Sequence, residues 1–351
     1  QMLPVTAETA KSVTVFQRTA NFVMPAVQKP MTPEWDKEIK ENYDDIIAKC
    51  RNHVFGMAFD SPVGRTIADT PPEEVQKILE EHWPRGSFRF VFETFDDLLG
   101  DPESNKVAGD FVIKKMKERV NDPEIAEMLT PKGYPFFAKR PPLDHNYFEA
   151  YNRENVKLVD INDREPIVEF TETGIHTTEN EYEFDIVVLA TGFQAYTGAQ
   201  EALPIRGRNG LLLRDKWDAV SSSILGVFVA EFPNLFMITG PQAPFANLPT
   251  SIEQNIKYIV DCVKKMESEG YDLCEPQQKA EDDWVQHVAE VHEQTLMAQG
   301  DKVHSWMMGA NLEDRAPRVL IYFGGANVYY DLMRTSVDSG FPEVQFEKLG
   351  L

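Results

Sequence analysis

The sequence predicts an α/β fold with a parallel sheet, and three observations support that prediction. Residues 185–192 and 233–240 are two continuous apolar runs, and each closes on a glycine. Such runs are typical of strands that are buried on both faces of a parallel sheet. The third observation is a pair of amphipathic helices in the last third of the chain, as a sheet covered by helices requires.

The first residues fit the second half of a nucleotide-binding β-α-β unit. Residues 2–10 resemble the end of a helix, and residues 12–18 read as a short strand that ends on Arg18, with Thr19 next to it. In a doubly wound α/β domain, the charges at such a strand end select the nucleotide. No Gly-rich phosphate loop precedes this strand. We therefore expect a fold that is incomplete at its N-terminus.

A charged helical insertion is predicted over residues 31–131. Thr32 is the expected N-cap of its first helix, and Thr70 with Glu73 forms a capping box ahead of another. Residues 122–124 are expected to start another short helix. We find no pattern in this segment that indicates chemistry.

Strands and turns dominate from residue 132 onward. Residues 155–160 read as a strand, residues 166–185 as β-hairpins, and Asn209–Gly210 as a tight hairpin turn. Two helices then follow, each with an apolar stripe: Ile252, Ile256, Ile259, Val260, Val263 and Met266 in the first, and Ala280, Trp284, Val288 and Val291 in the second.

Composition limits the kinds of partner. The 351 residues have a formal net charge of −22, which argues against nucleic acid and anionic membranes. No apolar run is long enough to span a bilayer, and the three cysteines favour a reducing, cytoplasmic compartment. The seven histidines lack metal-binding spacing, so no metal is expected.

Lys139 and Arg140 are the most suggestive local pair. Adjacent residues on an extended segment point to opposite sides, so the two cations serve different faces. Pro141 and Pro142 restrict the backbone and fix the direction of the guanidinium, which suits a cation that must hold developing negative charge. An ordinary surface pair beside a rigid loop is the alternative reading.

Three further places could approach a ligand. Thr191 and Gly192 follow an apolar run, where glycine permits close contact, although a tight turn explains them equally well. The loop before Pro249 leads into a helix N-terminus that favours an electron-rich group, although simple capping is sufficient. Trp306 could donate a hydrogen bond to a pocket or anchor the core.

Taken in order, five segments carry a stronger signal than any of them alone. They are VTVFQRTANFVMP, KGYPFFAKRPPLDHNYFEAYNRENVKLVDI, DIVVLATGFQAYTGA, FPNLFMITGPQAPFANLPTSIEQ and SWMMGANL. This series resembles Baeyer–Villiger monooxygenases, and its fourth segment looks most like the cyclohexanone monooxygenase branch. The resemblance implies a Rossmann-like flavoprotein fold with two dinucleotide-binding domains, and FAD and NADPH as cofactors. The implied reaction uses O₂ to convert a ketone to an ester or lactone through a flavin C4a-peroxide.

The resemblance also implies roles for the basic residues. By matching position, Arg18 and Lys139 would bind the 2′-phosphate of NADPH, with Thr19 beside them. Two cations from separate segments can clamp one phosphate dianion. Arg140 would lie over the flavin and the nicotinamide and would stabilise the anionic intermediates.

The remaining roles fall in the C-terminal part. Trp306 matches a tryptophan on the loop that closes on NADP, and the resemblance implies a catalytic role for it alongside Arg140. Leu248 would lie by the flavin ring and line the substrate pocket, Phe245 would shape that pocket, and Thr191 and Gly192 would contact the cofactor. The implied partners are a small-molecule ketone and O₂.

The chain lacks the two Gly-rich dinucleotide loops of that family. The resemblance is therefore to the C-terminal portion, with residues 1–30 and 132–190 as a partial NADPH-binding domain, 31–131 as the insertion, and 191–351 as the C-terminal part of the FAD-binding domain. Two other functions stay open. One is a non-catalytic, truncated homologue that acts as a nucleotide-binding or scaffold module, and the other is a flavin S- or N-oxygenase.

Overall fold

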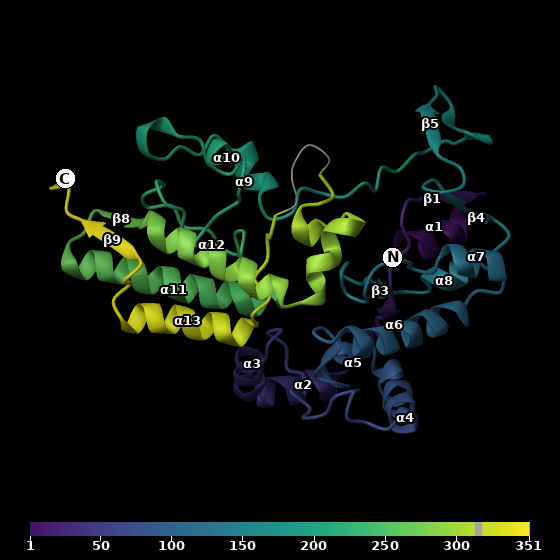
Figure 1. Cartoon of the computed structure of the whole chain (residues 1–351), viewed down its shortest axis with the longest axis horizontal. Coiled ribbons are helices and arrows are strands. Elements are labelled where there is room, and N and C mark those ends of the chain that lie inside the picture. The colour runs from purple at the N-terminus through teal and green to yellow at the C-terminus, as the bar shows by residue number, and fades with distance from the viewer. Residues whose placement is uncertain (313–317, 351) are drawn as a thin grey trace. The chain divides into compact units, whose positions relative to one another are not determined.

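The computed structural model describes residues 1–312 and 318–350 and divides the chain into two compact units. Unit 1 comprises residues 1–28 and 62–192, and unit 2 comprises residues 29–61 and 193–351. Both units combine helices with strands (Figure 1). The predicted insertion is therefore not one body, because its first part packs with the C-terminal part of the chain. Backbone hydrogen bonds of 2.8 Å tie Val54 to Ala326 and Phe55 to Asn247.

Unit 1 contains a parallel pair of strands and a set of helices. Its elements are α1 (Met2–Thr9), β1 (Val13–Gln17), β2 (Met24–Pro25), α4 (Pro72–His82), the 3-10 helix η1 (Trp83–Arg85), α5 (Arg89–Phe92), α6 (Pro102–Lys117), α7 (Pro123–Met128), β3 (Leu143–Asp144), α8 (Tyr147–Ala150), β4 (Val156–Asp160), β5 (Ile167–Phe170), β6 (Gly174–Thr177) and β7 (Glu181–Glu183). Strand β1 pairs in parallel with β4, in the register Val13 to Val156. Strands β2 and β3 form a second short parallel pair, and β5, β6 and β7 form the predicted antiparallel hairpins.

Aromatic side chains form much of the core of unit 1. Phe90 of α5 stacks on Phe111 of α6 with ring centroids 5.7 Å apart, and Phe136 packs edge-on against Phe90. All three rings are almost completely buried. This packing fixes residue 136, which lies just before the basic pair at 139 and 140.

One of the two predicted helix caps is confirmed, and the helix expected to start at residues 122–124 is present. Thr32 accepts a hydrogen bond from the backbone N–H of Trp35 at the start of α2 (Pro33–Glu41), and Asp122 caps α7. Thr70 does not cap α4, because its hydroxyl donates to the carbonyl of Thr66 at 2.6 Å. Helix α4 instead begins after Pro71, whose fixed φ suits a helix start.

Unit 2 is built around three long helices, which are α11 (Leu248–Glu269), α12 (Gln278–Glu293) and α13 (Ala326–Asp338). Its other elements, besides α2, are α3 (Tyr43–Asn52), α9 (Gly198–Ala202), the 3-10 helix η2 (Arg208–Gly210), α10 (Leu213–Lys216), β8 (Leu273–Pro276), the 3-10 helices η3 (Leu296–Val303) and η4 (Trp306–Met308), and β9 (Val344–Glu347). Helices α11 and α13 run side by side (Figure 1), and β8 pairs antiparallel with β9. Both predicted C-terminal helices are confirmed as α11 and α12. Asn209 and Gly210 take the positive φ values that a tight turn needs.

Helix α11 buries a polar face. Asn255 donates to the hydroxyl of Tyr329 at 2.9 Å, and the hydroxyls of Ser251 and Tyr330 are also 2.9 Å apart. Because these groups are hydrogen-bonded, their burial against α13 is not costly. Part of the predicted apolar stripe is exposed instead, with Ile256 at 45% and Val260 at 42%.

The two predicted buried strands are wrong. Residues 185–192 and 233–240 run without strand geometry. A strand needs a neighbour that supplies backbone hydrogen bonds, so apolar and β-branched residues are not sufficient by themselves. Neither segment has a ladder partner among the residues that the structure describes.

Among residues 1–312 and 318–350, no helix combines the length and apolar composition that crossing a bilayer requires.

Candidate functional site

The predicted site residues are distributed over the two units. Unit 1 contains Arg18, Thr19, Lys139, Arg140, Thr191 and Gly192, and unit 2 contains Phe245, Leu248 and Trp306. Each group is described within its own unit.

Arg18 and Thr19 directly follow the carboxyl end of β1, and both are exposed. The side-chain amide of Gln17 donates to the carbonyl of Met128 at 2.9 Å, which ties this strand end to α7. The parallel pairing with β4 continues to the last residue of the strand, where Gln17 lies opposite Asp160. These contacts hold Gln17 in place, and they therefore fix the backbone position from which the Arg18 side chain extends.

A second segment, residues 134–140, is held against the chain that follows Arg18. The hydroxyl of Tyr134 donates to the carbonyl of Ala20 at 2.6 Å, and Asn21 donates to the carbonyl of Arg140 at 3.1 Å. The ring of Phe22 packs edge-on against Tyr134 at 5.5 Å. These contacts join two segments that are far apart in the sequence.

The result is a cluster of cations. Lys139 is partly buried, and burial together with the nearby charge of Arg18 lowers its pKa. Within residues 1–312 and 318–350 neither Arg18 nor Lys139 forms an ion pair, and two neighbouring like charges favour an anion between them. The structure thus brings Arg18 and Lys139 together in unit 1.

Arg140 has different surroundings from Lys139. Its guanidinium lies 5.3 Å from the centre of the Phe88 ring. Desolvation by surrounding protein atoms lowers the pKa of Arg140, although the residue as a whole remains exposed. An arginine keeps its positive charge at neutral pH even with such a shift, so this is a fixed cation on an aromatic surface.

The backbone beside this cluster is strained. Phe137 is fully buried and has φ +79°, in a region that costs a residue with a side chain on the order of 1–3 kcal/mol. Its ring packs against Phe88 at 5.6 Å, so the core that holds Phe137 also supports the ring beneath Arg140. Such strain concentrates at functional sites.

Thr191 and Gly192 do not follow a buried strand, contrary to the sequence prediction. Both residues are exposed, and the preceding apolar residues are exposed as well. Gly192 has φ +99°, a value that favours glycine, so the backbone conformation at this point accounts for its presence.

In unit 2, Phe245 and Trp306 belong to one apolar cluster. They pack around the buried residues Met307, Leu320 and Ile321, together with Tyr196 and Phe323. Trp306 stacks on Tyr196 with centroids 6.2 Å apart, and Phe245 packs on Phe323 at 5.7 Å. Burial raises the pKa of Tyr196 to about 12, so its hydroxyl stays protonated and can donate a hydrogen bond.

Leu248 is the first residue of α11 and is 50% exposed. The preceding Asn247 is fixed by hydrogen bonds to Phe55, Gly56 and Thr250. The helix start is therefore rigid while the leucine side chain remains open to a ligand.

Sequence reasoning missed the residues that assemble these groups. Tyr134 and Asn21 lock the basic segment, and Tyr196, with φ +64°, stacks on Trp306. Tyr134 lies in the second of the five segments that carry the family resemblance. Its hydrogen bond to Ala20 nevertheless spans 114 residues, and no local sequence pattern reveals such a contact.

Over residues 1–312 and 318–350, no group of His, Cys, Asp and Glu side chains is arranged to hold a metal ion.

No model of a known protein family matches the chain. Individual relatives do. A Baeyer–Villiger monooxygenase of Pseudooceanicola batsensis is 39% identical over 343 residues, which cover 97% of this chain and 62% of that protein. A phenazine N-monooxygenase of Lysobacter antibioticus is 37% identical with the same coverage, and a cyclohexanone 1,2-monooxygenase of Acinetobacter is 37% identical over 94% of this chain and 60% of its own length.

Solved structures agree with these sequences. A closed cyclohexanone monooxygenase superposes with a TM-score of 0.93 at 38% identity and covers 99% of this chain, which in turn covers 64% of it. A complex of OTEMO with FAD and NADP gives a TM-score of 0.92 at 33% identity, over 98% of this chain and 63% of that one. The predicted fold class and the resemblance to Baeyer–Villiger monooxygenases are thereby confirmed, and the chain spans about three-fifths of the length of these relatives.

Proposed function

We propose, from the similarity to Baeyer–Villiger monooxygenases over 97% of the chain, that this protein serves in an NADPH- and flavin-dependent oxygenation of a ketone. One oxygen atom of O₂ enters between the carbonyl carbon and a neighbouring carbon, and the other leaves as water. NADPH supplies two electrons, so that ketone, O₂, NADPH and H⁺ give an ester or lactone, NADP⁺ and water. The observation that carries the proposal is the pair of cations Arg18 and Lys139, with Arg140 next in the sequence, within a fold shared with NADP- and FAD-bound relatives.

The donor set of this cluster fits NADPH. A 2′-phosphate carries close to two negative charges and several acceptor oxygens, and the guanidinium of Arg18 and the ammonium of Lys139 supply charge-assisted hydrogen bonds. The exposed hydroxyl of Thr19 adds a neutral donor. The chain has no G-x-G-x-x-G loop, so the fit to FAD rests on the exposed segment with Thr191 and Gly192 and on Leu248.

Arg140 is proposed as the catalytic cation. When bound, NADPH and FAD together supply the reducing electrons and the activation of O₂. The part of Arg140 is to hold a fixed positive charge where negative charge develops on oxygen, and a charge that is already in place needs no reorganisation. The Phe88 ring beside the guanidinium excludes water from one of its faces, and this partial dehydration strengthens the attraction between the cation and the developing negative charge.

The aromatic cluster of unit 2 is proposed to recognise the substrate and to close on the nucleotide. Phe245 and Leu248 offer apolar contact area to a ketone, and the Trp306 indole can donate a hydrogen bond.

The buried, free thiols of Cys50, Cys262 and Cys274 suit a reducing compartment, and we place the protein in the cytoplasm.

The test is product analysis with the purified full chain, supplied with FAD, NADPH and cyclohexanone. We expect a flavin absorbance band near ~450 nm and NADPH-dependent formation of the lactone. Arg140→Ala should abolish lactone formation while NADPH binding persists, and Lys132→Ala serves as a control from the same segment. A colourless protein that neither binds NADPH nor forms lactone would reject the proposal in favour of a non-catalytic module.

Oxygenation of nitrogen or sulfur is the second candidate. It is supported by the phenazine N-monooxygenase, which is 37% identical over 97% of the chain. A competition between equimolar cyclohexanone, a phenazine and an organic sulfide separates the possibilities. Predominant N-oxide or sulfoxide would reject the ketone as the substrate and keep the flavin chemistry.

A further inference from the structure

We propose that Tyr196 is a positioning residue for Trp306. The phenol ring of Tyr196 holds the indole of Trp306 in one orientation before the nucleotide binds. This inference deepens the proposed function and rests on it, because that function gives Trp306 its contact with the nucleotide. Both residues lie in unit 2.

The two rings are stacked. Their centroids are 6.2 Å apart and their planes differ by 17°. Offset aromatic pairs at this distance attract each other beyond the effect of burial alone. Over residues 1–312 and 318–350, no protein group accepts a hydrogen bond from the Trp306 indole N–H. The stack therefore orients this donor and leaves it free for a ligand.

Hydrogen bonds hold the turn that carries Tyr196. The side-chain amide of Gln194 donates to the hydroxyl of Thr197 at 3.0 Å and to a carboxylate oxygen of Glu201 at 2.7 Å. Thr197 and Glu201 are both buried. Because Glu201 belongs to α9, these bonds tie the turn to a helix and fix the backbone from which the Tyr196 ring extends.

The backbone of Tyr196 itself is strained. Its φ is +64°, in the left-handed region that residues with a side chain rarely adopt. In this conformation the ring lies against Trp306, and the stack offsets part of the strain. Unfavourable backbone conformations of this kind concentrate at functional sites.

The segment that carries Trp306 is joined to the same turn at a second point. The side-chain amide of Asn311 donates to the backbone carbonyl of Phe193 at 3.1 Å. Residues 193–197 and 305–311 are thus linked by a hydrogen bond as well as by the stack. The hydrogen bond holds the two backbones together, and the stack is the link that acts on the indole.

Preorganisation is the expected effect of this stack. A tryptophan side chain that is free to rotate loses that freedom when a ligand fixes it, and the loss weakens binding. If the stack already populates the competent orientation, the loss does not occur at binding. We therefore expect Tyr196 to strengthen nucleotide binding through Trp306, without itself contacting the nucleotide.

The first experiment needs no nucleotide. The full chain is labelled with 5-fluorotryptophan, so that its five tryptophans give five fluorine resonances, and Trp306→Leu identifies the resonance of Trp306. The ring current of Tyr196 displaces this resonance. Tyr196→Leu should therefore shift it, whereas Tyr196→Phe keeps the ring and should leave it nearly in place.

The second experiment measures the affinity for NADP⁺ by isothermal titration, since NADP⁺ carries the 2′-phosphate and cannot reduce a flavin. Tyr196→Leu should weaken binding by about two- to tenfold, as expected for the loss of one aromatic pair. In a chain that already carries Trp306→Leu, the same change should have little further effect, because a positioning residue acts only through the residue that it positions. Tyr196→Phe should bind as the original chain does.

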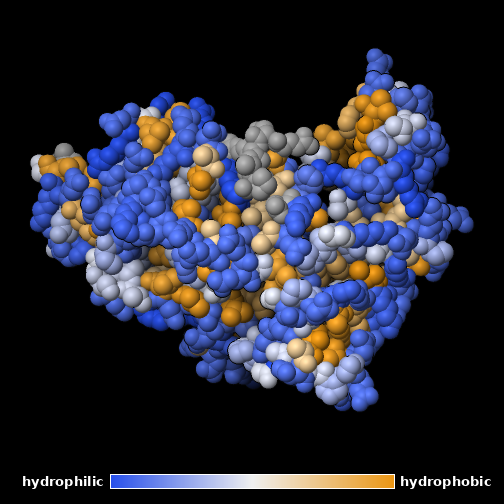
Figure 2. Space-filling model, viewed as in Figure 1, coloured by the Kyte–Doolittle hydropathy of each residue, from blue (hydrophilic) through white to orange (hydrophobic). Residues whose placement is uncertain are grey.

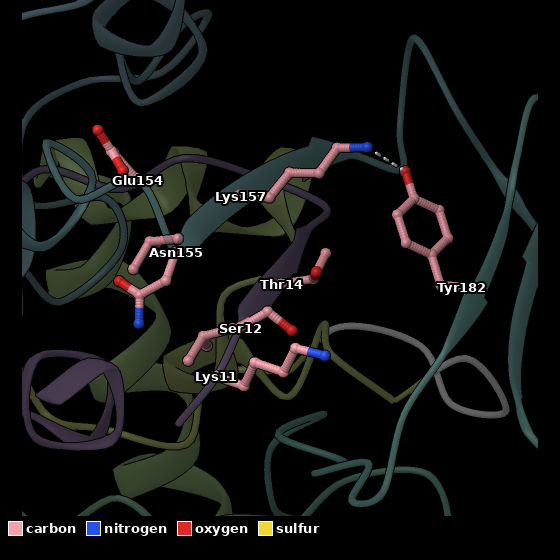
Figure 3. A pocket seen from close by; sticks show the side chains of 9 residues that line it. Lys11, Ser12, Thr14, Glu154, Asn155, Lys157 and Tyr182 are labelled. Carbon is pink, nitrogen blue, oxygen red and sulfur yellow. Dashed lines mark hydrogen bonds between the residues drawn. The ribbon is translucent and has the colours of Figure 1, made fainter. Parts of the chain in front are cut away.

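Tyr182 in unit 1 offers a matched control. It stacks on Phe184 with ring centroids 6.1 Å apart, and it lines an open pocket of about 370 Å³, where Nζ of Lys157 donates to its hydroxyl at 2.9 Å (Figure 3). Hydrophobic residues also reach the surface near β5 of the same small sheet (Figure 2), where Val168 is 56% exposed. Tyr182→Leu thus removes a ring stack from another apolar region, and it should change neither the Trp306 resonance nor the affinity for NADP⁺.

Three results would overturn the proposal. The first is an unchanged Trp306 resonance in Tyr196→Leu, and the second is a shift in Tyr196→Phe as large as that in Tyr196→Leu. The third is an affinity for NADP⁺ that Tyr196→Leu leaves unchanged or lowers equally with and without Trp306, because an equal loss would make Tyr196 a support of the fold only. Failure of the unaltered chain to bind NADP⁺ would count against the proposed function, and the fluorine spectra would then decide whether Tyr196 orients Trp306.

Discussion

At the scale of single residues, the cation cluster of unit 1 is where chemistry is best supported. Arg18 ends a strand and Lys139 lies in a segment that Tyr134 and Asn21 lock in place. Neither cation would be held near the other without those contacts, because like charges repel. An anion bound between the two cations would relieve the repulsion that these contacts impose.

The first prediction concerns the choice between NADPH and NADH. Arg18→Ala and Lys139→Ala should each weaken NADPH binding by about 10- to 100-fold, because each removes a charge-assisted hydrogen bond to the 2′-phosphate. NADH lacks that phosphate, so its affinity should change little. Isothermal titration of both nucleotides measures the difference.

Lys132→Ala is the matched control, since Lys132 is a nearby lysine whose ammonium is 2.7 Å from a Glu127 carboxylate. Equal losses for NADPH and NADH would show that the two cations do not read the 2′-phosphate.

The second prediction concerns pH. Burial and the charge of Arg18 lower the pKa of Lys139 below its ordinary value of 10.5. The cationic form binds the phosphate, so NADPH affinity should fall as pH rises through the lowered pKa. Arg18→Gln removes one cause of the shift and should move the decline to higher pH. Titrations at increasing pH measure this, and a decline confined to pH values above 10.5 would contradict it.

At the scale of secondary structure, helix starts could be predicted from sequence and buried strands could not. A cap is a local interaction, and Thr32 and Asp122 cap α2 and α7 as their neighbours suggest. Residues 155–160 also form the expected strand, because β1 is available to pair with them. Residues 185–192 carry an equally strong strand pattern, but they have no ladder partner among the described residues.

The third prediction tests the cap of α7. Asp122 accepts hydrogen bonds from the N–H groups of Glu124 and Ile125 at 2.8 and 3.3 Å. Asp122→Ala should destabilise α7 by about 1 kcal/mol, and its amides should exchange roughly fivefold faster. Hydrogen-exchange mass spectrometry over residues 123–128 measures this.

Asp122→Asn keeps an acceptor and should retain most of the protection. Because Met128 accepts a hydrogen bond from Gln17, exchange at the end of β1 should also rise in the alanine variant. Unchanged exchange in α7 would mean that tertiary packing, not the cap, holds this helix.

The site follows the same rule of locality. The sequence motifs indicated Arg18, Lys139 and Arg140, and the structure explains how two of them come together. The sequence did not indicate that Arg140 lies over Phe88, a residue 52 positions earlier, because contacts at that separation depend on how the whole core packs. The roles of these residues remain predictions.

At the scale of the whole molecule, a large negative charge coexists with exposed apolar surface. The net charge of −22 keeps copies of the chain apart, while residues 186–189 and Phe193, at 90% exposure, favour association. The balance between these two effects should depend on pH, because the charge comes from an excess of Asp and Glu.

The last prediction follows from that balance. Lowering the pH from 7 toward the isoelectric point of about 4.7 protonates carboxylates and removes the repulsion, whereas the apolar surface is unchanged. Light scattering should therefore rise steeply along this pH range. Val188→Asp should reduce the rise, because it interrupts the apolar run. Thr178→Asp adds the same charge at an exposed turn and leaves the apolar run intact, so it should reduce scattering much less. Equal effects of the two variants would show that charge alone, and not residues 186–189, controls association.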